Sequence, residues 1–231
     1  MPALEDILQR YAIWRGAAVG RFSLSISTRY EELDRELPGG GWSAGALTEI
    51  LCDEEGIGEL ELVLPALAAL SWAGKRVVWL APPHLPYAPA LAAAGVDLAH
   101  LAVVRAPGRR DALWAAEQVL RSGSCHALLG WFRRAGYGEL RRLAVAAEGS
   151  PTWVALYRPC EAADEPSPAC LRLALEPEGT IRILKRRGAP AAAPLRLALN
   201  RPFHALGRAP LPGACAGIAR TDRRLGLPVH A

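Results

Sequence analysis

The feature that most constrains this fold is a repeated alternation of short, wholly apolar runs with segments of helical periodicity. Each run has apolar residues at consecutive positions, so both sides of an extended strand would be apolar. Such strands are typical of a parallel sheet covered by helices on both faces. We therefore predict an α/β fold with a mostly parallel sheet, whose strands are residues 46–51, 77–80, part of 96–104, 125–131 and 152–157.

Helical segments fill the intervals between these strands. Thr28 and Glu31 have the spacing of a capping box, Asp111 is placed to cap a helix, and Pro65 should kink the helix that contains it. The predicted helices are residues 3–15, 31–37, 57–73, 87–94, 111–121 and 137–148.

The pattern changes after an acidic, proline-containing loop at residues 161–169. Leucines then alternate with charged or small residues, which predicts a small antiparallel meander. The last segment holds four prolines, four glycines and five arginines, so we expect it to order only on a partner. The predicted organisation is an N-terminal amphipathic helix (1–20), a core (21–160), an antiparallel extension (161–200) and a basic tail (201–231).

Composition excludes several classes of protein. No apolar run is long enough to span a membrane, and the N-terminus has no basic segment followed by an apolar one, so we expect no signal peptide. The five cysteines form no Cys-x-x-Cys pair and have no zinc spacing. We expect reduced thiols, no metal and a cytoplasmic location.

The order of several motifs resembles the approach to the nucleotide loop of RecA-type recombinases. The residues that carry this resemblance are Ile26-Ser27-Thr28, Leu33-Asp34, Pro38-Gly39-Gly40-Gly41-Trp42 and Gly45-Ala46-Leu47-Thr48-Glu49-Ile50. Residues 74–80 are similar to that family's second core strand. The resemblance covers about residues 25–200 and implies a RecA-like fold.

The nucleotide loop itself is degenerate. A Walker loop needs two glycines, a lysine and a hydroxyl residue, because backbone amides and the lysine hold the phosphates. The corresponding positions hold Cys52, Ile57, Gly58 and Glu59. Five acidic residues stand between positions 53 and 61 without a base, so a triphosphate would meet repulsion where it needs a cation.

The positions of the two supporting carboxylates are also changed. The strand-end glutamate that would activate water aligns with Pro83, beside His84, and the Mg²⁺-supporting aspartate aligns with Gly130 or Trp131. We therefore expect no catalytic residues, no cofactor and no enzymatic activity. An ATPase with a non-standard site is the remaining enzymatic alternative.

A RecA-like scaffold with these departures resembles the ImuA family, most specifically in Gly56-Ile57-Gly58-Glu59-Leu60 and Leu64-Pro65-Ala66-Leu67. The resemblance implies a non-catalytic accessory role in damage-inducible translesion synthesis, with ImuB and, indirectly, an error-prone C-family DNA polymerase as partners. SulA, a cell-division inhibitor that acts on FtsZ, shares the degenerate core and is the alternative.

Candidate binding residues are mainly arginines. The group after the fourth strand suits a DNA backbone, and it suits an ordinary solvated helix face equally well; it comprises Arg133, Arg134, Arg141 and Arg142. The tail suits a partner protein through Arg220, Arg223, Arg224, Leu225 and Leu227. The N-terminal helix could mediate self-association. Trp42, within a glycine-rich turn, is expected to be the most exposed tryptophan.

Overall fold

The computed structural model describes residues 24–53, 56–188 and 193–199. The predicted N-terminal helix and the predicted tail, with Arg220, Arg223, Arg224, Leu225 and Leu227, lie outside these residues. No helix in the described part is long and apolar enough to cross a membrane.

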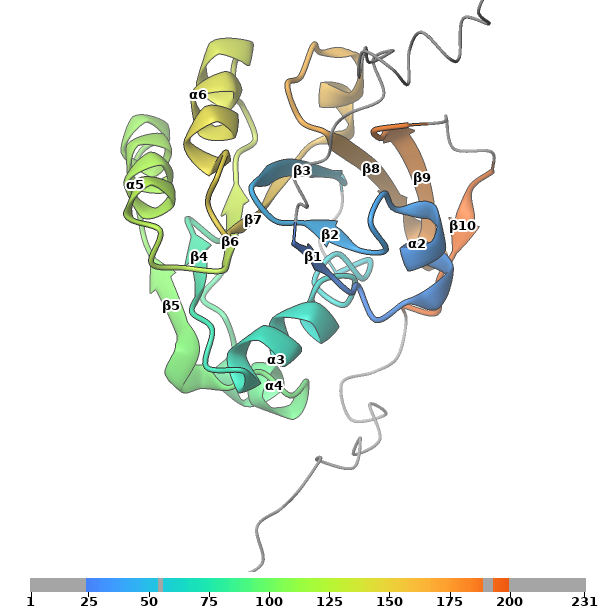
Figure 1. Ribbon diagram of the computed structural model, residues 1–231, viewed down its shortest axis with the longest axis horizontal. Helices are drawn as coiled ribbons and strands as arrows, with labels where there is room; N and C mark the ends of the chain where they lie inside the picture. The colour runs from blue at the N-terminus through green and yellow to red at the C-terminus, as the bar shows by residue number, and fades with distance from the viewer. Residues whose placement is uncertain (1–23, 54–55, 189–192, 200–231) are drawn as a thin grey trace, which may run out of the picture.

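The core is an eight-stranded sheet with the order β10-β9-β8-β3-β7-β6-β4-β5 (Figure 1). Neighbouring strands from β8 to β5 run parallel, and β8, β9 and β10 form an antiparallel meander. The strands are β3 (Ala46–Leu51), β4 (Val77–Leu80), β5 (Leu101–Val104), β6 (Ala127–Trp131), β7 (Trp153–Arg158), β8 (Leu171–Glu176), β9 (Thr180–Lys185) and β10 (Leu195–Arg196). This confirms the predicted α/β class. It also shows that β8, expected in the antiparallel extension, is itself parallel to β3.

Helices cover both faces of the sheet, as Figure 1 shows. Helices α5 (Arg109–Ser122) and α6 (Tyr137–Ala147) pack on one face, and α2 (Glu31–Glu36), α3 (Leu64–Trp72) and α4 (Ala88–Ala93) on the other. Successive residues of the central strands point to opposite faces, so Leu128 and Leu129 enter different hydrophobic clusters. This explains why the strands are apolar at every position.

Three local predictions about helix ends are wrong. Pro65 lies in the first turn of α3 and so begins that helix instead of kinking it, because a proline there costs no backbone hydrogen bond. Gly108 is the N-cap of α5, and Asp111 lies in its first turn. The Thr28 hydroxyl accepts from the Tyr30 amide at 3.1 Å, and no side chain caps α2.

The prediction that Trp42 is exposed is also wrong. Trp42 lies in β2 (Trp42–Ser43), which pairs with β1 (Ser25–Ile26), and its ring is fully buried. It stacks on Trp153 with centroids 4.8 Å apart and planes 11° apart. A Cβ at Gly41 would lie 2.3 Å from the carbonyl oxygen of Ile26, so this glycine lets the chain pass close enough to insert the ring.

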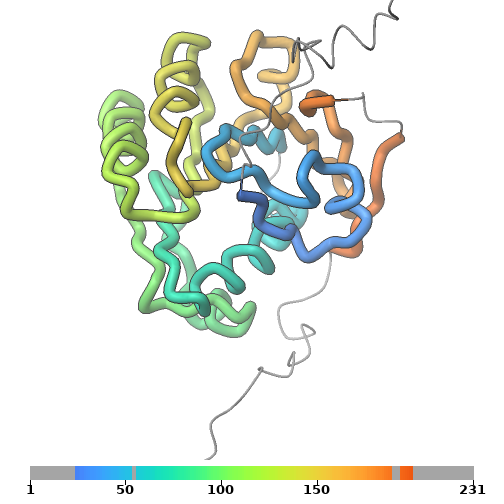
Figure 2. Tube along the Cα trace, viewed as in Figure 1, coloured from blue at the N-terminus to red at the C-terminus, as the bar shows by residue number. Residues whose placement is uncertain are grey.

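The segment before β3 crosses to the C-terminal strands of the sheet. In Figure 2 the blue trace of residues 24–45 lies beside the orange trace of β9 and β10. An ion pair of 2.8 Å joins Glu36 to Arg186, and Tyr30 donates through its hydroxyl to the carbonyl oxygen of Glu61. The first contact fixes α2 to the residue that follows β9, and the second fixes Tyr30 to the segment before α3.

Candidate functional site

A cavity of about 1210 Å³ opens at the carboxyl ends of the parallel strands. We call it the cleft. Loops that follow four neighbouring strands line it: Cys52 and Asp53 follow β3, and Pro159 follows β7. The loop after β6 contributes residues 132–136, and the loop after β4 contributes residues 82–87. This edge is where open α/β sheets bind their ligands.

Three aromatic rings form the floor of the cleft. Trp131 stacks on Tyr157 with centroids 4.9 Å apart, and Trp79 lies 5.5 Å from Trp131. The Tyr157 hydroxyl donates to the backbone carbonyl of Glu59 at 2.9 Å. Burial, followed by the nearby charges of Cys52 and Glu59, raises the pKa of Tyr157 well above its ordinary value. The phenol therefore stays neutral and remains a hydrogen-bond donor.

The loop that would hold a nucleotide is closed by its own side chains. Both carboxylate oxygens of Glu59 accept from the Gly56 amide, at 2.9 and 3.1 Å. Asp53 accepts from the Cys160 amide at 2.7 Å. A carboxylate thus already accepts a hydrogen bond from a backbone amide of the kind that a Walker loop presents to phosphate.

The other degenerate-loop residues are held by packing. Cys52 and Ile57 are partly buried against the core, and a Cβ at Gly58 would lie 2.9 Å from the Cβ of Leu199. Gly58 has a φ of +103°, a conformation that favours glycine. Its role in this chain is to let Leu199 approach.

The position aligned with a magnesium-supporting aspartate has no room for a carboxylate. A Cβ at Gly130 would lie 2.5 Å from the ring of Phe132 and 3.2 Å from Leu156. Pro83 and His84 both line the cleft. Within the described ranges, no group of three histidine, cysteine, aspartate or glutamate side chains is arranged to hold a metal ion.

The predicted DNA-binding arginines lie in two places. Arg133 and Arg134 are exposed and line the cleft together with Arg109. Arg141 and Arg142 lie on α6 and line a separate, shallow hollow with Glu117 and Arg121 of α5. The four arginines are therefore close together in the sequence but do not form one surface.

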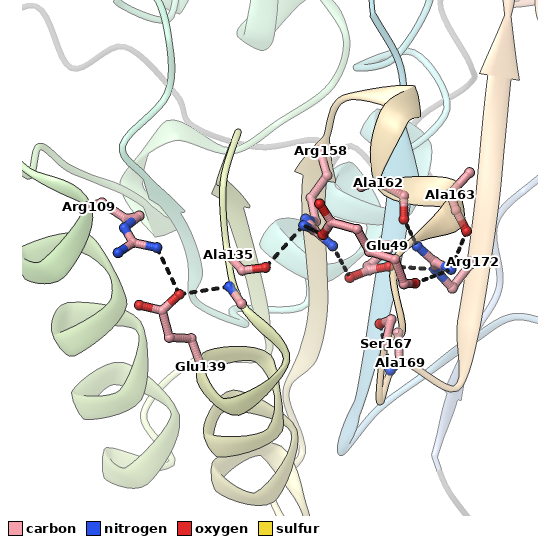
Figure 3. A network of polar contacts seen from close by, with 12 residues as sticks. Glu49, Arg109, Ala135, Glu139, Arg158, Ala162, Ala163, Ser167, Ala169 and Arg172 are labelled. Carbon is pink, nitrogen blue, oxygen red and sulfur yellow. Dashed lines mark hydrogen bonds and ion pairs between the residues drawn. The ribbon is translucent and has the colours of Figure 1, made fainter.

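A buried network of charges at the base of the cleft was not predicted from the sequence. Glu49, at zero exposure, accepts from Arg158 Nη1 at 3.1 Å and from Arg172 Nε at 2.6 Å (Figure 3). Arg158 Nη2 also donates to the Ala135 carbonyl at 3.1 Å and to the exposed carboxylate of Glu165 at 2.6 Å. The network ties β3, β7 and β8 to the loops that line the cleft.

A second set of contacts continues toward α5. Glu139 accepts from the Gly136 amide at 2.8 Å and from Arg109 at 3.0 Å (Figure 3). Gly136 directly follows Ala135, whose carbonyl accepts from Arg158. Polar contacts therefore hold the loop after β6 both to β7 and to α6. The sequence signal was available, since Glu49 and Arg172 are charged residues inside mostly apolar strands and Arg158 ends a third one, and an unpaired buried charge is very costly.

Comparison with known proteins relates part of the chain to SulA. No protein-family model matches. Over 100 residues the chain is 31% identical to the cell division inhibitor SulA of Edwardsiella piscicida, a stretch that is 43% of this chain. The chain spans about 60% of the length of that relative. The crystal structure of SulA from Pseudomonas aeruginosa matches 48% of this chain and 96% of its own, at 23% identity and a TM-score of 0.42. The sequence is thus related to SulA at modest identity.

Proposed function

We propose that this chain is a non-catalytic accessory protein of a damage-inducible translesion synthesis complex. In this proposal it acts with an ImuB-type protein in the cytoplasm and, through that partner, with an error-prone C-family DNA polymerase. The helix predicted at residues 1–20 would mediate self-association, and the tail would contribute partner contacts.

The observation that carries the proposal is the state of the nucleotide loop. The Glu59 carboxylate already satisfies the Gly56 amide, and Asp53 satisfies the Cys160 amide. A phosphate placed there would meet two carboxylates and would have to displace them. Such a scaffold supports a function that depends on binding other molecules at its surface and not on ATP hydrolysis.

The relationship to SulA supports a role in the SOS response to DNA damage, in which the proposed complex also works. The ImuA-like motif adds support from the structure of this chain. Residues 56–60 form the closed loop, and Leu64, Ala66 and Leu67 are buried at the start of α3. The motif therefore coincides with the segment in which Glu59 accepts from the Gly56 amide and with the start of α3.

Co-purification from DNA-damaged cells tests the proposal. We expect the tagged full chain to retain an ImuB-type protein, and we expect its Arg220, Arg223 and Arg224 to alanine variant to retain less. The matched control replaces Arg35, Arg121 and Arg182, which are exposed on the core, with alanine. Failure of both the wild-type and the control chain to retain the partner would contradict the proposal.

Calorimetric titration with Mg²⁺·ATP tests the absence of nucleotide chemistry separately. We expect no binding tighter than millimolar, because the site offers carboxylates where a cation is needed. Saturable binding in the micromolar range would overturn this part of the proposal and favour an ATPase with a non-standard site.

A SulA-like inhibitor of FtsZ is the second candidate, and the 31% identity to SulA favours it. The two candidates differ in a direct assay. An inhibitor would reduce the GTPase rate and the polymerisation of purified FtsZ in proportion to its concentration, whereas an ImuB partner would leave both unchanged.

A further inference from the structure

The cleft carries charges of opposite sign on its two sides. Loops after the adjacent strands β3 and β7 contribute the acidic wall, which consists of Asp53, Glu59, Glu161 and Glu165. Arg158 also lines the cleft on this side and pairs with Glu165 at 2.6 Å, which leaves Asp53, Glu59 and Glu161 without a cation in the cleft lining. The loop after β6 and the start of α5 contribute the basic wall, which consists of Arg109, Arg133 and Arg134. A strand of nucleic acid fits the basic wall but is repelled by the acidic one, so a polyanion cannot fill the whole cleft.

The described chain ends at the acidic wall. Leu197 and Leu199 are buried, at 3% and 2% exposure, and the Leu197 amide donates to the Gly179 carbonyl at 2.9 Å. Leu199 lies against Gly58, within the loop that bears Asp53 and Glu59. The described chain therefore ends beside the loop that bears Asp53 and Glu59.

The composition of that following segment complements the acidic wall. Residues 200–231 contain five arginines and a single acidic residue, Asp222. An extended chain covers about 3.3–3.6 Å per residue, so roughly ten residues span some 35 Å, enough to cross a cleft of this size.

We propose that the cleft binds the chain's own segment 200–231, whose arginines pair with Asp53, Glu59 and Glu161. The inference stands on the charges of the cleft and the position of Leu199, and it does not depend on which partner the proposed function names.

Hydrogen–deuterium exchange on the full chain tests this inference. The variant replaces all five tail arginines with serine (Arg201, Arg208, Arg220, Arg223 and Arg224). We expect amides of residues 56–60 and 160–165 to exchange roughly tenfold faster in the variant at low salt, because several surface ion pairs are lost together. Amides of α6, away from the acidic wall, should not change. Equal exchange in the two proteins at the acidic wall would overturn the proposal.

Charge reversal on the cleft gives the complementary test. Glu161 is exposed and lines the cleft, so Glu161→Lys should raise exchange at the acidic wall, whereas Glu32→Lys, on the exposed face of α2, should not. Unchanged exchange at the acidic wall in Glu161→Lys would contradict ion pairing there. Protection that rises with protein concentration would assign the bound segment to a second copy and would overturn binding within one chain.

Discussion

The Glu49 carboxylate lies 2.6 Å from Arg172 Nε, joining the neighbouring parallel strands β3 and β8 through a fully buried ion pair. The same carboxylate pairs with Arg158 of β7, so one acid holds cations from both neighbours of its strand. Burying these charges is costly, and their mutual contacts offset the cost only while the set is complete.

Removal of the central acid should therefore destabilise the fold. We expect Glu49→Gln to lower the free energy of unfolding by about 3–5 kcal/mol, because two buried guanidinium groups lose their shared counter-ion. Urea denaturation followed by circular dichroism measures the change. The control is Glu31→Gln, whose ion pair with Arg35 is largely exposed and should contribute no more than about 0.5 kcal/mol. Equal effects of the two substitutions would contradict the assigned role of burial.

The stacked tryptophan pair should contribute strongly to stability. Trp42→Ala removes a fully buried ring from its contact with Trp153, so we expect a loss of about 3–5 kcal/mol. Trp114→Ala serves as the control, because that side chain is 64% exposed on α5. A thermal unfolding series that ranks Trp114→Ala as the more damaging change would disprove this arrangement.

We predict that single-stranded DNA binds at the basic wall of the cleft. We expect the pair Arg133→Ala and Arg134→Ala to weaken binding and to reduce the slope of log affinity against log salt by about 1.4, at roughly 0.7 for each phosphate contact. Fluorescence anisotropy at several salt concentrations measures the slope. The pair Arg141→Ala and Arg142→Ala, which lies on the other surface, should leave the slope unchanged. The reverse ranking would move the DNA site to the α5–α6 surface.

Tyr157 should make stability fall at alkaline pH. Its pKa is raised in the folded protein, so the unfolded chain releases the phenolic proton first. The contribution is complete below the ordinary tyrosine pKa of about 10 and is lost as pH rises toward the higher folded value. We expect Tyr157→Phe to cost about 1 kcal/mol at neutral pH, through the lost bond to Glu59, and to show a shallower decline above pH 10. Parallel declines would contradict the raised pKa.

The sequence by itself determined the class of fold and the absence of a Walker motif from the loop after the first strand of the sheet. Strands that are apolar at consecutive positions require cover on both faces, and this property is local, so it can be recognised without a structure. The degenerate loop can also be recognised without a structure, because the lysine and the hydroxyl residue of a Walker loop are missing from the sequence itself. Helix ends were less accessible, because the chain starts each helix at a neighbouring residue: Thr28 accepts from Tyr30 without capping α2, and α5 starts at Gly108, before Asp111.

Only the tertiary structure decided which distant residues share a surface. Glu49 and Arg172 are separated by 123 positions yet form one buried pair, because β8 returns beside β3. Arg134 and Arg141 are close in sequence yet lie on different surfaces, because a loop ends and a helix begins between them. Trp42 is buried for the same kind of reason: Gly41 allows the close backbone approach, but the ring of Trp153 that receives it comes from a strand more than a hundred positions away.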